Sequence, residues 1–191
     1  MRASLAKHLR INARYRNNRV CSRGIKQRCM IRFLALAPGQ TRNSIAKKLV
    51  LELGMRPSNS YSYVFKELEK CLIPSGIVEE SGYKKTGMGP RALQESGIPT
   101  FRLTHVGMLV ATSIEELGFE KRIEIVERYL ISKATSNPSQ FPLYEFMLAQ
   151  FHGDPKTKLQ LIESGVFGFI EGKIEHPIIP MLEESMEQMS R

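Results

Sequence analysis

The chain has 191 residues, of which 42% are hydrophobic and 25% are charged, as in ordinary globular proteins. No apolar run approaches the roughly 20 residues that span a bilayer, and no apolar secretory signal is present, so we expect a cytoplasmic protein without a membrane partner. The three cysteines (Cys21, Cys29 and Cys71) include no close pair, which disfavours a disulfide framework or a four-cysteine zinc site and indicates reduced, buried thiols.

The net charge of +9 is distributed very unevenly along the chain. Residues 1–51 carry thirteen Lys and Arg and no acid, residues 52–112 nearly balance, and residues 113–191 hold eight bases and thirteen acids. This asymmetry predicts that the front half meets a polyanion such as nucleic acid, whereas the acidic rear half has another role.

Residues 1–28 are predicted to form a basic, flexible arm. Leu5, Leu9 and Ile11 give only a weak apolar stripe, so the segment buries too little apolar area to offset its ordering entropy. We expect disorder, or a helix induced by nucleic acid. Two alternatives are an organellar transit peptide and a true start at Met30. The candidate contacts in the arm are Arg10, Arg14, Arg16, Arg19 and Arg23.

Three helices are expected between residues 29 and 73. Apolar residues recur at three- and four-residue spacing from Cys29 up to a Pro-Gly pair, which predicts the first helix. Thr41 is placed to cap the second helix and Gly54 to stop it. The third helix has a strong 3.6-residue period, and its predicted core face comprises Tyr61, Val64, Phe65, Leu68, Cys71 and Leu72.

Two strands and a fourth helix follow. Residues 77–81 and 100–103 are predicted as strands joined by a long glycine-rich loop, and Thr104 is placed to cap a helix that runs to Leu117. Residues 29–117 therefore form one predicted domain that is mostly α with a small two-stranded β-sheet.

This order of elements is carried by residues 45–49, 64–68 and 76–78 and by the stretch from Phe101 to Gly107. Together they resemble the winged helix-turn-helix superfamily of prokaryotic transcriptional regulators, many of which share a strand-to-helix junction similar to residues 101–107. This sequence differs in its longer second helix, its longer exit from the third helix and its much longer wing loop.

The resemblance implies a winged helix-turn-helix whose third helix lies in the major groove of DNA. Opposite its predicted core face, this helix offers amide, hydroxyl and ammonium groups that suit base edges and phosphates. The candidate contacts are Arg56, Ser58, Asn59, Ser62, Tyr63, Lys66 and Lys70. Glu67 and Glu69 favour the alternative of an ordinary solvated helix face, because carboxylates repel phosphate.

Further cations are candidates for phosphate contacts beside this helix. Arg42, Lys47 and Lys48 lie on the second helix. Lys84, Lys85 and Arg91 lie in the wing loop, where they are expected to contact phosphates or a minor groove. The alternative for the loop is a mobile, solvated segment.

Residues 118–191 are predicted to be helical. Asp154-Pro155 is a helix-start signal, and the apolar, glycine-containing stretch 166–170 is predicted to be a turn in a small core. Two roles stay open for this region. It forms the interface of a homodimer that binds two half-sites, or it covers the winged-helix core.

No catalytic or cofactor motif stands out. A phosphate-binding loop is missing, no nucleophile is paired with a base, and His152, Asp154 and His176 match no metal-ligand spacing. The sequence thus predicts a DNA-binding transcriptional regulator associated with the nucleoid, without enzyme activity, metal or cofactor. The alternatives are an architectural or replication-associated protein that binds any duplex, and a winged-helix protein-interaction module in an RNA or nucleoprotein assembly.

Overall fold

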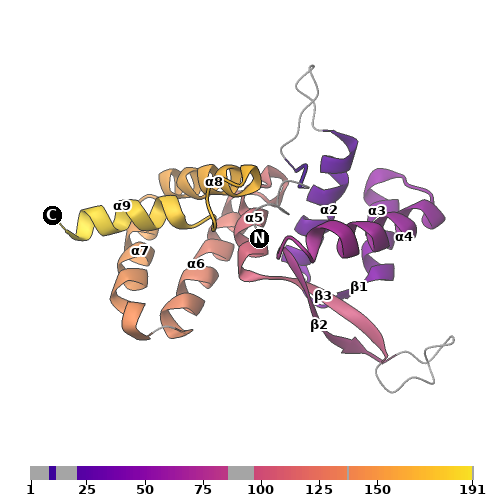
Figure 1. The fold of residues 1–191 in the computed structure, drawn as a ribbon, viewed down its shortest axis with the longest axis horizontal. Coiled ribbons are helices and arrows are strands. Elements are labelled where there is room, and N and C mark those ends of the chain that lie inside the picture. The colour runs from indigo at the N-terminus through magenta and orange to yellow at the C-terminus, as the bar shows by residue number, and fades with distance from the viewer. Residues whose placement is uncertain (1–8, 12–20, 86–96, 137, 191) are drawn as a thin grey trace. The chain divides into compact units, whose positions relative to one another are not determined.

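The computed structural model describes residues 9–11, 21–85, 97–136 and 138–190, which group into two compact units (Figure 1). The first unit runs to Gly107 and the second begins at Met108, ten residues before the boundary expected from the sequence. The chain is mostly helical and contains a small antiparallel sheet, as predicted, but the sheet has three strands instead of two.

The first described helix, α2 (Ser22–Leu36), begins seven residues before the predicted start at Cys29. Its N-cap is Cys21, whose Sγ accepts a hydrogen bond from the Gly24 amide at 3.3 Å. The apolar spacing of the sequence does not predict these extra turns, because the residue that they bury at position 27 is a polar glutamine.

Part of the predicted arm also belongs to the core of the first unit. Leu9 and Ile11 are buried, and the Arg10 amide donates to Oε1 of Gln27 at 2.6 Å. The prediction that residues 1–28 form a flexible arm is therefore wrong for residues 9–11 and 21–28. Arg14, Arg16 and Arg19 lie outside the described residues.

Helix α3 (Arg42–Leu53) has the predicted boundaries. Thr41 Oγ1 accepts a hydrogen bond from the Ser44 amide at 3.2 Å, and Gly54 ends the helix in the left-handed conformation with φ of 63°. The next helix, α4 (Pro57–Glu67), starts with proline at its first position and continues into a π-helical turn, η1 (Leu68–Leu72). The Ile73 amide donates to the Leu68 carbonyl, which is the five-residue spacing of a π-turn.

The sheet combines β1 (Gln40–Thr41), β2 (Val78–Lys84) and β3 (Ile98–Leu103) in the order β1-β3-β2. Both predicted strands are confirmed and are longer than expected, whereas β1 is too short to leave a periodic pattern. The β2–β3 hairpin is antiparallel and contains an irregularity between Glu80 and Gly82. Its connecting residues 86–96, with the candidate Arg91, lie outside the described residues.

The junction that follows β3 matches the prediction. Thr104 Oγ1 accepts a hydrogen bond from the Gly107 amide at 3.0 Å and so caps α5 (His105–Thr112). Position 107 must be glycine, because a Cβ atom there would lie 2.0 Å from the Ile77 carbonyl oxygen. The start of α5 is thereby packed closely against the chain just before β2.

The second unit is helical and has its own core. Its elements are η3 (Glu115–Leu117), α6 (Phe119–Ser136), η4 (Pro138–Gln140), α7 (Phe141–Gly153), α8 (Pro155–Glu171) and α9 (Ile179–Met189). Asp154 caps α8 by accepting from the Thr157 amide at 3.1 Å, as predicted. The predicted turn at 166–170 is wrong, because these residues continue α8. Gly165 allows the chain at Pro177 to pack directly against that helix.

Candidate nucleic-acid interface

Helix α4 exposes a face that differs from the predicted one. Val64 and Leu68 are buried as expected, but Tyr61 is 48% exposed and Phe65 is 44% exposed, so the prediction that both are core residues is wrong. The outward face of α4 consists of Ser58, Asn59, Tyr61, Ser62, Phe65 and Lys66. Ser58, Ser62 and Phe65 follow one another at spacings of four and three residues and form the middle of that face.

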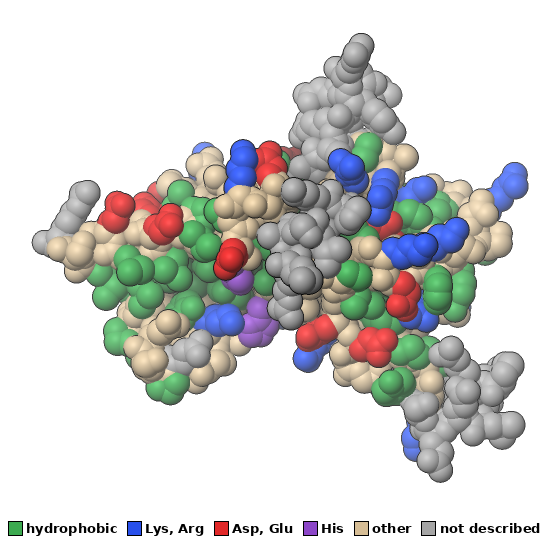
Figure 2. All heavy atoms as spheres, viewed as in Figure 1, with side chains coloured by type: hydrophobic (Ala, Val, Ile, Leu, Met, Phe, Trp, Pro, Cys, Tyr) green, Lys and Arg blue, Asp and Glu red, His purple; other side chains and the backbone are tan. Residues whose placement is uncertain are grey.

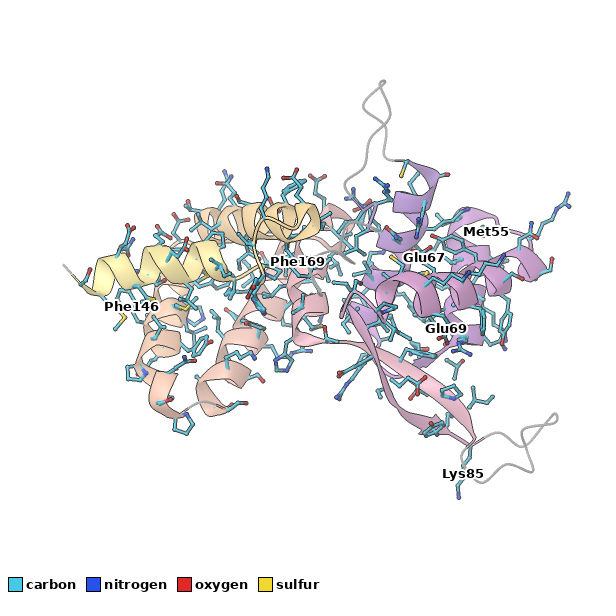
Figure 3. The ribbon with its side chains drawn as sticks, viewed as in Figure 1. Met55, Glu67, Glu69, Lys85, Phe146 and Phe169 are labelled. Atoms are coloured by element: carbon cyan, nitrogen blue, oxygen red, sulfur yellow. The ribbon has the colours of Figure 1, made fainter. Side chains whose placement is uncertain are left out.

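The rotation of α4 is explained by Glu67, which is buried against α2 (Figure 3). Its carboxylate accepts hydrogen bonds from Arg23 Nη2 at 3.0 Å and from Gln27 Nε2 at 2.6 Å. Burial by itself would raise the pKa of Glu67, but the bonds from Arg23 and Gln27 outweigh it and lower that pKa. A charged Glu67 can therefore take a core position, and Arg23, a predicted arm contact, is paired with it although the Arg23 side chain is itself 42% exposed.

Tyr63 also turns toward α2 and is not on the outward face. Its hydroxyl lies 3.5 Å from the Arg23 carbonyl oxygen, to which it donates, and Lys26 Nζ lies 4.9 Å from the centre of its ring. Burial is the main cause of the raised pKa of Tyr63. The predicted placement of Tyr63 on the outward side of the helix is therefore wrong, because its side chain is half-buried beside α2.

The second acid near the face, Glu69, is paired with Arg42 from the start of α3. The Arg42 side chain is only 15% exposed, and its guanidinium carbon lies 4.9 Å from the ring centre of Phe65 and 5.3 Å from that of Phe101. Arg42 was predicted to contact phosphate, but the structure places it between α4 and the sheet. Glu67 and Glu69 were expected to repel phosphate, but each of these carboxylates is paired with an arginine that offsets its charge.

Four predicted cations surround the outward face with exposed side chains. Within the parts of the chain that the structure describes, none of the four forms an ion pair. They are Lys47, Arg56, Lys66 and Lys70. Lys48 differs, because it pairs with Glu52 at 2.8 Å, and that carboxylate also accepts hydrogen bonds from Arg32 and Cys29. In the view of Figure 2, Lys and Arg side chains lie over the helices of the first unit.

The polar side chains of the outward face are available to a partner. Over the described residues, Ser58, Asn59 and Ser62 have no side-chain hydrogen bond to the protein. Ser60, by contrast, is buried and donates to the Pro57 carbonyl at 2.8 Å. The exposed hydroxyl and amide groups are therefore limited to the side of α4 that also carries Phe65 and Lys66.

The β2–β3 hairpin adds two of the predicted cations. Lys84 and Lys85 are exposed at its end, as Figure 3 shows for Lys85. Tyr83, which the sequence argument did not select, is exposed beside them at 61%. Alternation could not have identified Tyr83, because Glu80 and Ser81 are both exposed and the pairing register shifts between Glu80 and Gly82.

The histidines and cysteines of the described residues lie apart from the outward face of α4 or inside the fold. No three side chains of His, Cys, Asp or Glu gather there in a way that could hold a metal ion. His152 lies 3.0 Å from Glu127, and the His176 ring centre is 6.2 Å from that of Tyr129. The thiols of Cys29 and Cys71 have their pKa raised to about 12, mainly by burial, which is typical of unreactive core cysteines.

Comparison with models of protein families, with curated proteins and with solved structures found no match to this chain. None of the helices in the described part of the chain combines the length and apolar character that crossing a membrane requires.

Proposed function

We propose that the first unit binds double-stranded DNA as a winged helix-turn-helix, with α4 in the major groove and the β2–β3 hairpin as the wing. The order α2, α3, α4, β2, β3, α5 supports this arrangement, as does the threonine-capped junction into α5. The observation that carries the proposal is the outward face of α4, where unpaired cations and free polar groups occur together while both nearby acids are bound by arginines.

Each group on this face has a distinct role in the proposal. Lys66 and Lys70 contact phosphates on one side of the groove, and Arg56 and Lys47 contact phosphates near the start of α4. Asn59 and Ser62 supply the amide and hydroxyl groups that form hydrogen bonds with base edges. Lys84 and Lys85 bring the wing to the backbone beside the groove. Base contacts from α4 imply a preference among sequences, and hence a transcriptional regulator at the nucleoid.

The second unit is proposed to join two copies of the chain. Two half-sites spaced by about one helical turn would then be bound together. Its helices leave Ile131, Phe141 and Met186 between 44% and 54% exposed, which leaves apolar area for such an interface.

The proposal is tested by the affinity of the full-length chain for duplex DNA over a range of salt concentrations, measured by fluorescence anisotropy. A chain that starts at Met30 is unsuitable, because it lacks the first half of α2. The logarithm of the affinity should fall linearly with the logarithm of the salt concentration. Lys66→Gln and Lys70→Gln should each reduce that slope by about 0.9, the value expected for one lost phosphate contact.

Lys156→Gln is the matched control, because it removes the same charge from an exposed position on α8 in the second unit. It should leave the slope unchanged. If Lys66→Gln, Lys70→Gln and Lys156→Gln all reduced the slope equally, only the net charge of the chain would matter. That result would contradict a specific role for α4. No duplex binding at low salt would refute DNA binding and favour a protein-interaction module.

A further inference from the structure

An aromatic side chain occupies the middle of the outward face of α4. Phe65 is 44% exposed, although burying a phenylalanine is worth roughly 1.5–3 kcal/mol. Its neighbours along the same stripe, Ser58 and Ser62, are small hydroxyl residues. Phe65 therefore projects beyond them from the surface that, in the proposed function, enters the major groove.

The Phe65 ring packs against the charged side chain of Arg42. The Arg42 guanidinium carbon lies 4.9 Å from the centre of the Phe65 ring, and the same guanidinium is paired with Glu69 and lies 5.3 Å from the Phe101 ring. Phe101 is completely buried in β3. Arg42 thus links the exposed ring to the core, so that one side of the ring is supported by the protein and the remainder is left to solvent.

The other exposed aromatic residue of α4 has a different setting. Tyr61 lies at the edge of the outward face, where it lines an apolar groove of about 360 Å³ between α3 and α4 together with Val50 and Leu51. No cation lies over its ring within the described residues, in contrast to Phe65. Of the two aromatic residues, Phe65 is the one with a central and supported position.

The major groove offers one apolar group to such a ring. Guanine, cytosine and adenine present hydrogen-bond donors and acceptors there and no methyl group, whereas thymine adds its 5-methyl group, with which phenylalanine makes apolar contacts. If the Phe65 ring faced the edge of another base, it would remove water from polar atoms of that base without offering them a hydrogen bond. A ring at this position therefore favours thymine.

We propose that Phe65 recognises thymine through its 5-methyl group and that Arg42 is the positioning residue that holds the ring in place. This inference rests on the proposed function. It adds a defined element of sequence preference, a thymine at one fixed position of each half-site, with Asn59 and Ser62 contacting the neighbouring bases.

The test compares thymine with uracil, which pairs identically but lacks the methyl group. The full-length chain first selects duplexes from a random-sequence library. The best-bound duplex is then prepared with deoxyuridine in place of single thymidines, and the affinity for each version is measured. At one thymine position, loss of the methyl group should weaken binding by about fourfold, which corresponds to one buried methyl-sized group.

Three variants identify the residue responsible. Phe65→Ala should bind the thymine and uracil duplexes equally well, Phe65→Leu should keep part of the difference, and Tyr61→Ala should keep all of it. The unmodified chain already provides a decisive comparison if Phe65→Ala does not fold. Equal affinity for thymine and uracil at every position, or a selection without any fixed thymine, would overturn the inference and leave DNA binding intact. A failure to bind any duplex would instead refute the proposed function.

Discussion

Replacing Gly107 by alanine should destabilise the first unit strongly, because the new methyl group has no room. Its Cβ would lie 2.0 Å from the Ile77 carbonyl oxygen, a full ångström below the 3.0 Å that real Cβ contacts essentially never undercut. Ile77 cannot simply move away. Its carbonyl accepts a hydrogen bond from the Thr104 amide at 3.0 Å, and its side chain is completely buried.

The size of the effect follows from the contacts that must change. Forcing a methyl group into a packed position costs about 1–3 kcal/mol, and leaving a buried hydrogen-bonding group unpaired costs about 1–3 kcal/mol. Alanine returns about 0.5–1 kcal/mol through its better helix propensity. Adding the two costs at the middle of their ranges and subtracting the gain, we expect Gly107→Ala to lower the free energy of unfolding by about 3 kcal/mol.

Far-UV circular dichroism during urea denaturation measures this change, and Gly153→Ala is the matched control. Gly153 is also a helical glycine, but a Cβ atom there would meet nothing within 4 Å. The control should leave stability within about 1 kcal/mol of the unmodified chain. If Gly107→Ala were as stable as Gly153→Ala, the close packing of α5 against Ile77 would be refuted.

Two further changes test the ion pairs of the first unit. Glu67→Gln should lower the free energy of unfolding by about 1.5–3 kcal/mol, the worth of a hydrogen bond to a charged group, because Arg23 loses its partner; an unchanged urea midpoint would contradict the buried pair. For Glu52, burial alone would raise the pKa, but hydrogen bonds from Cys29, Lys48 and Arg32 lower it to about 2. Its contribution is fully present above pH 4.5 and is lost as the pH falls toward 2, so the stability difference between the unmodified chain and Glu52→Gln should shrink over that range. A difference that does not vary between pH 6 and pH 2.5 in urea titrations would argue against this pairing.

Local signals in the sequence were sufficient to predict several helix ends. Thr41, Thr104 and Asp154 each cap a helix, and Gly54 ends one, as expected. These predictions succeed because a cap is formed by residues three positions apart and by a backbone conformation that glycine adopts without strain. Nothing distant in the chain is needed to specify them.

The outward face of α4 could be predicted only in part. Asn59, Ser62, Lys66 and Lys70 are exposed as expected, although their contact with DNA stays a prediction. The phase of the helix was misjudged because apolar spacing favoured Phe65 inside and a carboxylate outside. The partners that allow Glu67 to be buried lie 40 and 44 residues earlier in the sequence, and no local pattern shows such a pairing.

The ion pairs that fix α4 in the fold also determine the electrostatic character of its surface. Arg23 of α2 binds Glu67, which is buried on the inner side of α4, and Arg42 of α3 binds Glu69, the carboxylate that lies close to the outward face. Lys66 and Lys70 then remain as unpaired charges beside the outward face. Their positive charge attracts a polyanion to a helix whose sequence, taken alone, shows acids and bases mixed. Packing of the three helices and affinity for nucleic acid are therefore coupled. Loss of Arg23 would leave the buried Glu67 without its cation and weaken the unit, whereas loss of Arg42 would also return the negative charge of Glu69 to the surface proposed to enter the groove.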